Sequence, residues 1–182
     1  ASESKRYRRT SEGKFEEMWR ECEDPWNASH EDYDASLCSL ATKHLVWQHL
    51  SETLVSIGSG NGRHMAWLGR DVEGVEISKT ARIQSRNTYP AIPVHMIPMA
   101  GYGIYLFREV LWYMLDSWHT IPDAGALVIV ELSFYDNQQY GLDYFNGPDD
   151  FVAKWPFTIE KIVREHTTKH QREGRIMVAG RI

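Results

Sequence analysis

The chain has 182 residues, with 20 basic and 25 acidic side chains and a formal net charge of −5. This length suits one domain with a sizeable core, and the acidic balance argues against a general affinity for nucleic acid or anionic membranes. No apolar run approaches the ~20 residues needed to span a bilayer, no signal peptide is visible, and Cys22 and Cys38 match no zinc pattern. We therefore expect a cytoplasmic protein with free thiols, no membrane or nucleic-acid partner and no metal site.

The N-terminal part of the chain has a helical pattern. Phe15, Met18 and Trp19 recur at helical spacing, and Pro25 should end this first helix. A second apolar stripe predicts a helix over 33–50. We interpret residues 1–44 as an N-terminal helical cap and residues 45–182 as the main domain, together forming one compact unit.

Strands and helices then alternate. Strands are predicted at 54–57, 72–77, 92–96, 103–107, 126–133, 157–165 and 175–182, and helices at 63–68, 79–87, 109–118 and 151–154. Ser78 is a plausible N-cap for the helix over 79–87, which Tyr89 and Pro90 should end. Alternation followed by a closing strand pair predicts an open α/β fold with right-handed crossovers.

The most informative segment is LVSIGSGNG, residues Leu54–Gly62, followed fourteen residues later by Glu76 in GVEIS. Gly58 and Gly60 allow a tight turn and a close approach of a ligand to the backbone. The first N–H groups of the helix that follows favour an anionic group. Glu76, at the tip of the next strand, can accept both hydroxyl protons of a ribose. The pattern therefore predicts a site for a nucleoside-containing cofactor.

The glycine spacing indicates which cofactor. A dinucleotide site favours G-x-G-x-x-G, whereas this chain has Gly58-x-Gly60-x-Gly62 followed by Arg63. The G-x-G-x-G form resembles motif I of the class I S-adenosylmethionine-dependent methyltransferases, and GVEIS resembles their acidic second motif. The resemblance implies S-adenosyl-L-methionine as cofactor and a Rossmann-like, doubly wound sheet of seven strands, order 3-2-1-4-5-7-6, with the last strand antiparallel.

The residues expected at the cofactor lie on the turn, on the N-terminal segment and at the carboxyl ends of strands. They are Trp26, Ser56, Gly58, Ser59, Gly60, Gly62, Glu76, Ile77, Met96 and Arg108. The chain departs from the family in two places. Ser56 stands where many members have an acid, and IPVHMIPMAGYG, after the third strand, supplies no carboxylate and leads unusually soon to the fourth strand.

A second resemblance lies ahead of the sheet. MWRECEDPWN resembles the W-x-x-x-x-D-P-W segment of methyltransferases related to the nodulation-factor N-methyltransferase group. The resemblance implies that N-terminal helices cap the cofactor, with Trp19, Trp26 and Tyr33 walling the site and His30 close by. The alternative is that these aromatic residues only pack the N-terminal helices on the sheet.

Catalysis of methyl transfer consists mainly of holding a nucleophile in line with an activated methyl group, with water excluded. Our candidate catalytic residues are Glu109, Arg108 and His30. Arg108 could clamp an acidic substrate, and Glu109 could orient an amine or hydroxyl or take its proton; the alternative is a helix-start acid beside a solvated arginine. The tyrosine-rich stretch after the fifth strand reads as a recognition loop, and the expected substrate-binding residues are Tyr33, Tyr135, Tyr140 and Tyr144.

These observations favour methyl transfer from S-adenosyl-L-methionine to O or N of a small polar acceptor, such as a saccharide or natural-product intermediate. Ser56 and the missing acid keep open a non-catalytic binding module of the same fold. An NAD-dependent oxidoreductase is disfavoured by the absent third glycine of G-x-G-x-x-G, and a nucleic-acid methyltransferase by the acidic balance. The aromatic content permits a homodimer.

Overall fold

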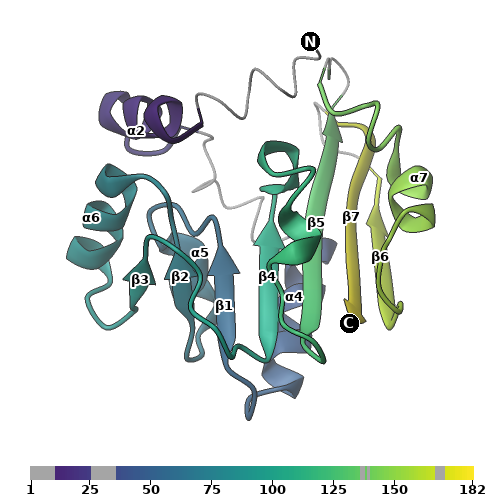
Figure 1. Cartoon of the computed structure of the whole chain (residues 1–182), viewed down its shortest axis with the longest axis horizontal. Helices are drawn as coiled ribbons and strands as arrows, with labels where there is room; N and C mark the ends of the chain where they lie inside the picture. The colour runs from purple at the N-terminus through teal and green to yellow at the C-terminus, as the bar shows by residue number, and fades with distance from the viewer. Residues whose placement is uncertain (1–10, 26–35, 136–137, 139, 167–170) are drawn as a thin grey trace.

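The computed structural model describes residues 11–25, 36–135, 138, 140–166 and 171–182. These residues build a seven-stranded sheet with the order β3-β2-β1-β4-β5-β7-β6 (Figure 1). The strands are β1 (Leu54–Ile57), β2 (Glu73–Val75), β3 (Val94–His95), β4 (Ile104–Arg108), β5 (Leu127–Tyr135), β6 (Lys161–Glu165) and β7 (Gln171–Arg181). Strands β1 to β5 are parallel, and β7 runs antiparallel to both β5 and β6. The predicted strand order and reversed last strand are confirmed.

Helices cover both faces of the sheet. They are α2 (Ser11–Glu21), α4 (Leu37–Gln48), α5 (Arg63–Leu68), α6 (Lys79–Thr88) and α7 (Pro148–Ala153), with the 3₁₀ helices η1 (Leu111–Tyr113) and η2 (Trp118–Thr120). Helices α4 and α5 supply Leu45, Val46, Met65 and Leu68 to a core on one face. Successive side chains of a strand point to opposite faces, so the strands also fill a second core, on the face that η1, η2 and α7 cover.

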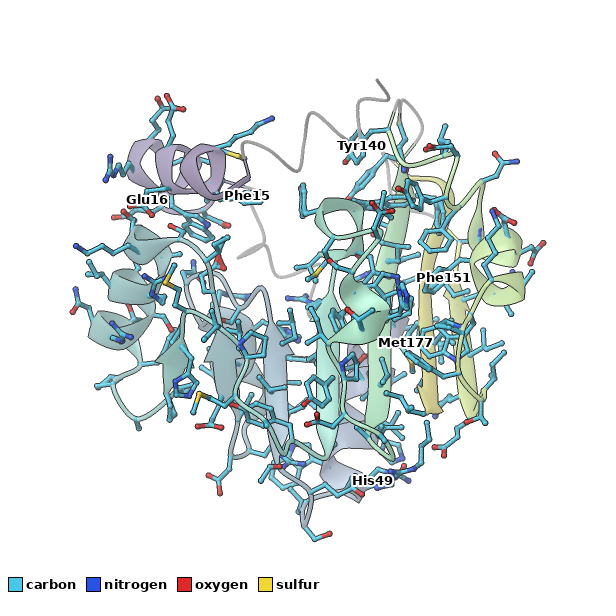
Figure 2. All side chains as sticks on the ribbon, viewed as in Figure 1. Phe15, Glu16, His49, Tyr140, Phe151 and Met177 are labelled. Carbon is cyan, nitrogen blue, oxygen red and sulfur yellow. The ribbon has the colours of Figure 1, made fainter. Side chains whose placement is uncertain are left out.

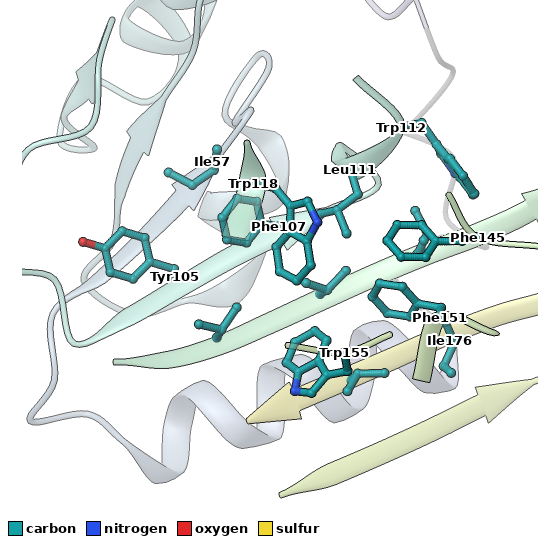
Figure 3. Close-up of a cluster of buried hydrophobic side chains, with 14 of the residues drawn as sticks. Ile57, Tyr105, Phe107, Leu111, Trp112, Trp118, Phe145, Phe151, Trp155 and Ile176 are labelled. Carbon is teal, nitrogen blue, oxygen red and sulfur yellow. The ribbon is translucent and has the colours of Figure 1, made fainter. Parts of the chain in front are cut away.

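The second core is rich in aromatic rings (Figure 3). Trp112, Trp118 and Trp155 pack edge-on or tilted against neighbouring rings; the Trp118 and Trp155 centroids, for example, lie 5.7 Å apart. Each pair of this kind contributes about 0.5–1.5 kcal/mol beyond simple burial. These three tryptophans thus stabilise the face of the sheet that η1, η2 and α7 cover.

The predicted helix over 109–118 is wrong, because the chain forms η1 and η2 instead. Leu111, Trp112 and Trp118 are all buried in the aromatic core. On a regular helix, positions 112 and 118 lie about 120° apart, so one continuous helix could not bring both rings onto the sheet. Glu109 also has a left-handed backbone, with φ 58°, which is not helical.

The other predicted elements lie close to where they were expected. Helix α6 begins after Ser78, whose hydroxyl accepts a 3.2 Å hydrogen bond from the Ala81 N–H, and it ends at Tyr89. Strand β3 has only two residues and is shorter than the predicted 92–96. Helix α4 runs across the boundary placed between residues 44 and 45. In the described part of the chain, no helix has the length and apolarity required to cross a membrane.

Candidate functional site

The turn between β1 and α5 brings bare backbone to the carboxyl edge of the sheet. Gly58, Gly60 and Gly62 have φ values of 72°, 57° and 85°, which glycine adopts without steric cost. A Cβ on Gly58 would lie 2.5 Å from Cγ1 of Val110, and one on Gly60 would lie 3.2 Å from the Trp19 ring. The turn therefore needs glycine both for its conformation and for its close packing.

Glu76 follows β2 directly and lies beside this turn. Its carboxylate accepts a long hydrogen bond, 3.4 Å, from the Gly60 N–H, and its residue is only 6% exposed. Burial raises the pKa of Glu76 to about 7, although the Gly60 and Ser78 backbone N–H groups act in the opposite direction. The two backbone donors therefore do not offset the desolvation of the charged carboxylate. Additional donors, such as ligand hydroxyl groups, would stabilise its charged form.

Ile77 and Met96 follow Glu76 and β3 on the same edge. Both are substantially exposed, at 37% and 50%, which is unusual for large apolar side chains beside a buried acid. Ser56 and Ser59 are buried, within β1 and in the turn. The structure thus places the turn, Glu76, Ile77 and Met96 along one edge, where open α/β sheets bind their ligands.

Helix α2 lies at the end of the sheet to which the arrowheads of β1, β4 and β5 point (Figure 1). Trp19 is buried against Gly60, and the Phe15 ring packs edge-on against Tyr113 of η1 with centroids 5.0 Å apart. Figure 2 shows Glu16 on the side of α2 that faces α6. Its carboxylate accepts hydrogen bonds from the hydroxyl groups of Ser78 at 2.7 Å and Thr80 at 2.6 Å, and from the Thr80 N–H at 3.1 Å. Helix α2 is therefore attached to elements on both sides of the glycine turn.

We expect Glu16→Gln to loosen α2. The three hydrogen bonds, led by those of Thr80 and Ser78, hold the Glu16 pKa at about 2 instead of 4.5. Since this pKa is lowered on folding, the stabilisation is present above pH 4.5 and is lost as the pH falls toward 2. At neutral pH, the variant should speed hydrogen exchange of the α2 amides about tenfold, the effect of losing about 1.4 kcal/mol of charge-assisted bonding. Exposed Glu17→Gln is the control, and equal exchange in both variants would contradict the assignment.

A second cluster lies where β4 and β5 end. Glu109 accepts hydrogen bonds from the Ser133 hydroxyl at 2.6 Å, the Ser133 N–H at 2.9 Å and Arg175 Nε at 2.7 Å. The side chain of Arg108 is instead nearly buried, 4.0 Å from the Glu131 carboxylate and 3.4 Å from the Ser39 hydroxyl. The Arg108 and Glu109 side chains therefore have different partners within the cluster, and substrate clamping by Arg108 stays a prediction.

Glu131 and Arg175 belong to this cluster and were not among the predicted site residues. Full burial alone would raise the pKa of Glu131, but the guanidinium groups of Arg175 and Arg108 outweigh burial and lower it. One signal was available in the sequence: Glu131 is the acid within the apolar run ALVIVELS, and a charge in a buried strand requires a partner. Nothing local pointed to Arg175, because the pairing of β5 with β7 brings it to the site.

The tyrosine-rich stretch is partly anchored in the core. Tyr140 packs edge-on against Trp112, with centroids 6.1 Å apart, and the Tyr144 hydroxyl donates to Asp116. Tyr135 ends β5 and is half-buried, and its N–H donates to Gln138. Trp26, His30 and Tyr33 lie outside the described residues.

The site therefore combines a glycine turn, a buried acid beside it, an apolar edge and a fixed carboxylate at the end of β4. The architecture that carries it is the class I S-adenosylmethionine-dependent methyltransferase fold. No protein-family profile matches the sequence, and no curated protein is detectably similar to it.

Solved structures share this fold at low sequence identity. An S-adenosylmethionine-dependent methyltransferase from Mesorhizobium loti superposes with a TM-score of 0.56 at 14% identity, covering 82% of this chain and 99% of that one. The N-methyltransferase NodS from Bradyrhizobium japonicum WM9, in complex with S-adenosyl-l-homocysteine, gives 0.58 at 12% identity over 88% and 92%. The glycopeptide N-methyltransferase MtfA, complexed with sinefungin, gives 0.54 at 11% identity over 78% and 93%.

Proposed function

We propose that this protein transfers a methyl group from S-adenosyl-L-methionine to O or N of a small polar acceptor in the cytoplasm. The observation that carries the proposal is buried Glu76 beside the left-handed glycine turn, with its carboxylate only 3.4 Å from the Gly60 N–H. The methyltransferase fold of the chain supports the proposal. Two free cysteines, Cys22 and Cys38, suit a reducing compartment.

The residues of the chain fit the two ends of this cofactor. Glu76 would accept the ribose hydroxyl groups, and the backbone of Gly58 and Gly60 would lie against the amino-acid part. A Cβ at either position would crowd Val110 or Trp19, which lie against the turn. Ile77 and Met96 would cover the apolar faces of the adenine. When bound, the cofactor supplies a methyl group already activated on a sulfonium.

The protein then has to position the acceptor and exclude water. Helix α2, through Trp19 and Phe15, would close the site above the glycine turn. Glu109 would accept a hydrogen bond from the N–H or O–H of the acceptor. Tyr135, Tyr140 and Tyr144, with Tyr33, would contact a polar acceptor such as a saccharide or natural-product intermediate, since phenolic hydroxyl groups donate and accept.

Calorimetry tests the cofactor assignment. S-adenosylmethionine and S-adenosylhomocysteine should bind in the micromolar range, and NAD should not bind measurably. Tight binding of NAD, without binding of S-adenosylmethionine or S-adenosylhomocysteine, would contradict the proposal.

A methyl-transfer screen tests the reaction, with glucosamine, glucose and catechol as amine, sugar and phenol probes. Transfer to at least one probe is expected, and Tyr135→Phe should lower its rate. Cofactor binding without transfer to any such compound, in a wider panel of amines, sugars and phenols, would favour the non-catalytic module. Ser56 and the missing acid after the third strand are the two features that keep this second candidate open.

A further inference from the structure

We propose that Arg175 is a positioning residue that holds the Glu109 carboxylate in place to receive the methyl acceptor. The inference rests on the proposed function and adds a residue from β7, far from the glycine turn in sequence. Arg175 acts through Glu109. The acceptor class that follows is one that presents an N–H or O–H donor.

Glu109 is fixed at both its backbone and its side chain. Its φ of 58° is the one positive value at a non-glycine residue in the described part of the chain, and strain of this kind persists only where the surroundings enforce it. Its N–H donates to the Glu131 carbonyl at 2.8 Å, which extends the β4–β5 pairing by one residue. Its carboxylate oxygens accept the bonds from Ser133 and Arg175.

Arg175 is itself held in one orientation by several elements. Its Nη1 donates to the Ser36 hydroxyl, the N-cap of α4, at 2.7 Å, and its Nη2 lies 2.9 Å from the Glu131 carboxylate. Glu131 in turn accepts a 2.9 Å bond from the Ser39 hydroxyl. One guanidinium thus joins α4, the end of β4, and β5, which its planar fork of donors allows and a lysine ammonium does not.

The cluster is better explained by positioning than by stability. Buried ion pairs are weak sources of stability, because desolvation of the charges offsets their attraction, and apolar residues can replace them. Arg175 is 3% exposed and Glu131 is fully buried, but the Glu109 side chain keeps 16% exposure. A carboxylate has about four acceptor positions, of which the three described donors occupy three. The network therefore ends at the Glu109 carboxylate, which reaches solvent and has about one acceptor position left for a ligand.

The first test is structural and independent of the acceptor. In a crystal structure of Arg175→Lys with S-adenosylhomocysteine, we expect the Glu109 carboxylate to move away from Ser133. The reason is that one lysine ammonium cannot bridge Glu109 and Glu131 as the guanidinium does. If Glu109 stays in its wild-type position in the variant, the inference is overturned.

The second test is kinetic and uses the probe that the wild type methylates. Arg175→Lys and the milder Ser133→Ala should lower kcat about 10–100-fold, the size of effect expected from a misplaced reacting group. The KM for S-adenosylmethionine and the affinity for S-adenosylhomocysteine should stay within about twofold, because neither residue lies at the glycine turn. If Arg175 and Ser133 had a purely structural role, the substitutions would lower the melting temperature without lowering kcat selectively at an unchanged KM. Arg164→Lys is the matched control, because Arg164 lies on neighbouring β6 and forms an exposed ion pair with Asp149 of α7.

The outcomes separate the two proposals. Unchanged kcat in both Arg175→Lys and Ser133→Ala, with the control also unchanged, removes the role of Arg175 and leaves the methyltransferase intact. Failure of the wild type to bind S-adenosylhomocysteine removes the proposed function itself, and with it the positioning role.

Discussion

Replacing Glu76 with alanine should weaken S-adenosylhomocysteine binding by about 100-fold or more. The carboxylate would accept two ribose hydroxyl groups, and each hydrogen bond to a charged group contributes about 1.5–3 kcal/mol, or roughly one to two powers of ten in affinity. Calorimetry on the variant measures the loss directly. Glu73→Ala is a suitable control, since Glu73 begins the strand that Glu76 follows and pairs with His95 away from the glycine turn. An affinity within a few-fold of wild type would contradict the ribose assignment.

The same acid should make cofactor binding depend on pH. Because the pKa of Glu76 is raised to about 7, its contribution to stability in the free protein is present below pH 4.5 and is lost as the pH rises through 7. Ribose hydroxyl groups donate to the ionised form, so binding should release a proton below pH 7. The affinity for S-adenosylhomocysteine should then rise up to about tenfold per pH unit below pH 7 and level off above it. Glu76→Gln should bind weakly and without this dependence, and a wild-type affinity that is flat from pH 5.5 to 8 would contradict the mechanism.

The substitution Gly58→Ala should reduce S-adenosylhomocysteine affinity by about 10–100-fold. Alanine at a φ of 72° costs about 1–2 kcal/mol, and its Cβ would lie 2.5 Å from Val110 Cγ1, so the turn or Val110 must shift from its present position. Calorimetry and thermal unfolding of the same sample separate affinity from stability.

Two further variants sharpen this prediction. Gly101 has a φ of 93°, and a Cβ added there would meet no atom of a non-neighbouring residue within 4 Å. Gly101→Ala therefore carries the conformational strain without the clash and should leave affinity unchanged. Adding Val110→Ala to Gly58→Ala removes the 2.5 Å contact with Cγ1, leaving Cβ at 3.3 Å, and should restore part of the affinity. If Gly58→Ala binds like wild type, the turn does not lie against the ligand.

The arrangement of the proposed cofactor residues was predictable because these residues are local in the sequence. Gly58, Gly60 and Glu76 belong to one strand–turn–helix–strand unit, whose geometry follows from glycine conformation and from the right-handed crossover between parallel strands. The N-cap at Ser78 follows from short-range hydrogen bonding in the same way. The structure brings these residues together as their spacing indicates.

The arrangement of the proposed acceptor residues was less predictable because they meet only through long-range pairing. Helical periodicity after Glu109 suggested a continuous helix, but burial of Trp112 and Trp118 in the aromatic core favoured two short 3₁₀ helices. Sequence adjacency also made Arg108 and Glu109 look like partners at one site, whereas the structure directs Arg108 toward Glu131 and Ser39.

The sequence alone determined the α/β class, the glycine turn and the acid that follows it, since these depend on local backbone preferences and on the periodicity of apolar residues. Only the tertiary structure decided that Arg175 reaches Glu109, because the β5–β7 register and the packing of α4 bring together residues more than sixty positions apart. Local propensities carry no information about such contacts. These contacts form only when burial of the two cores fixes every strand in its register.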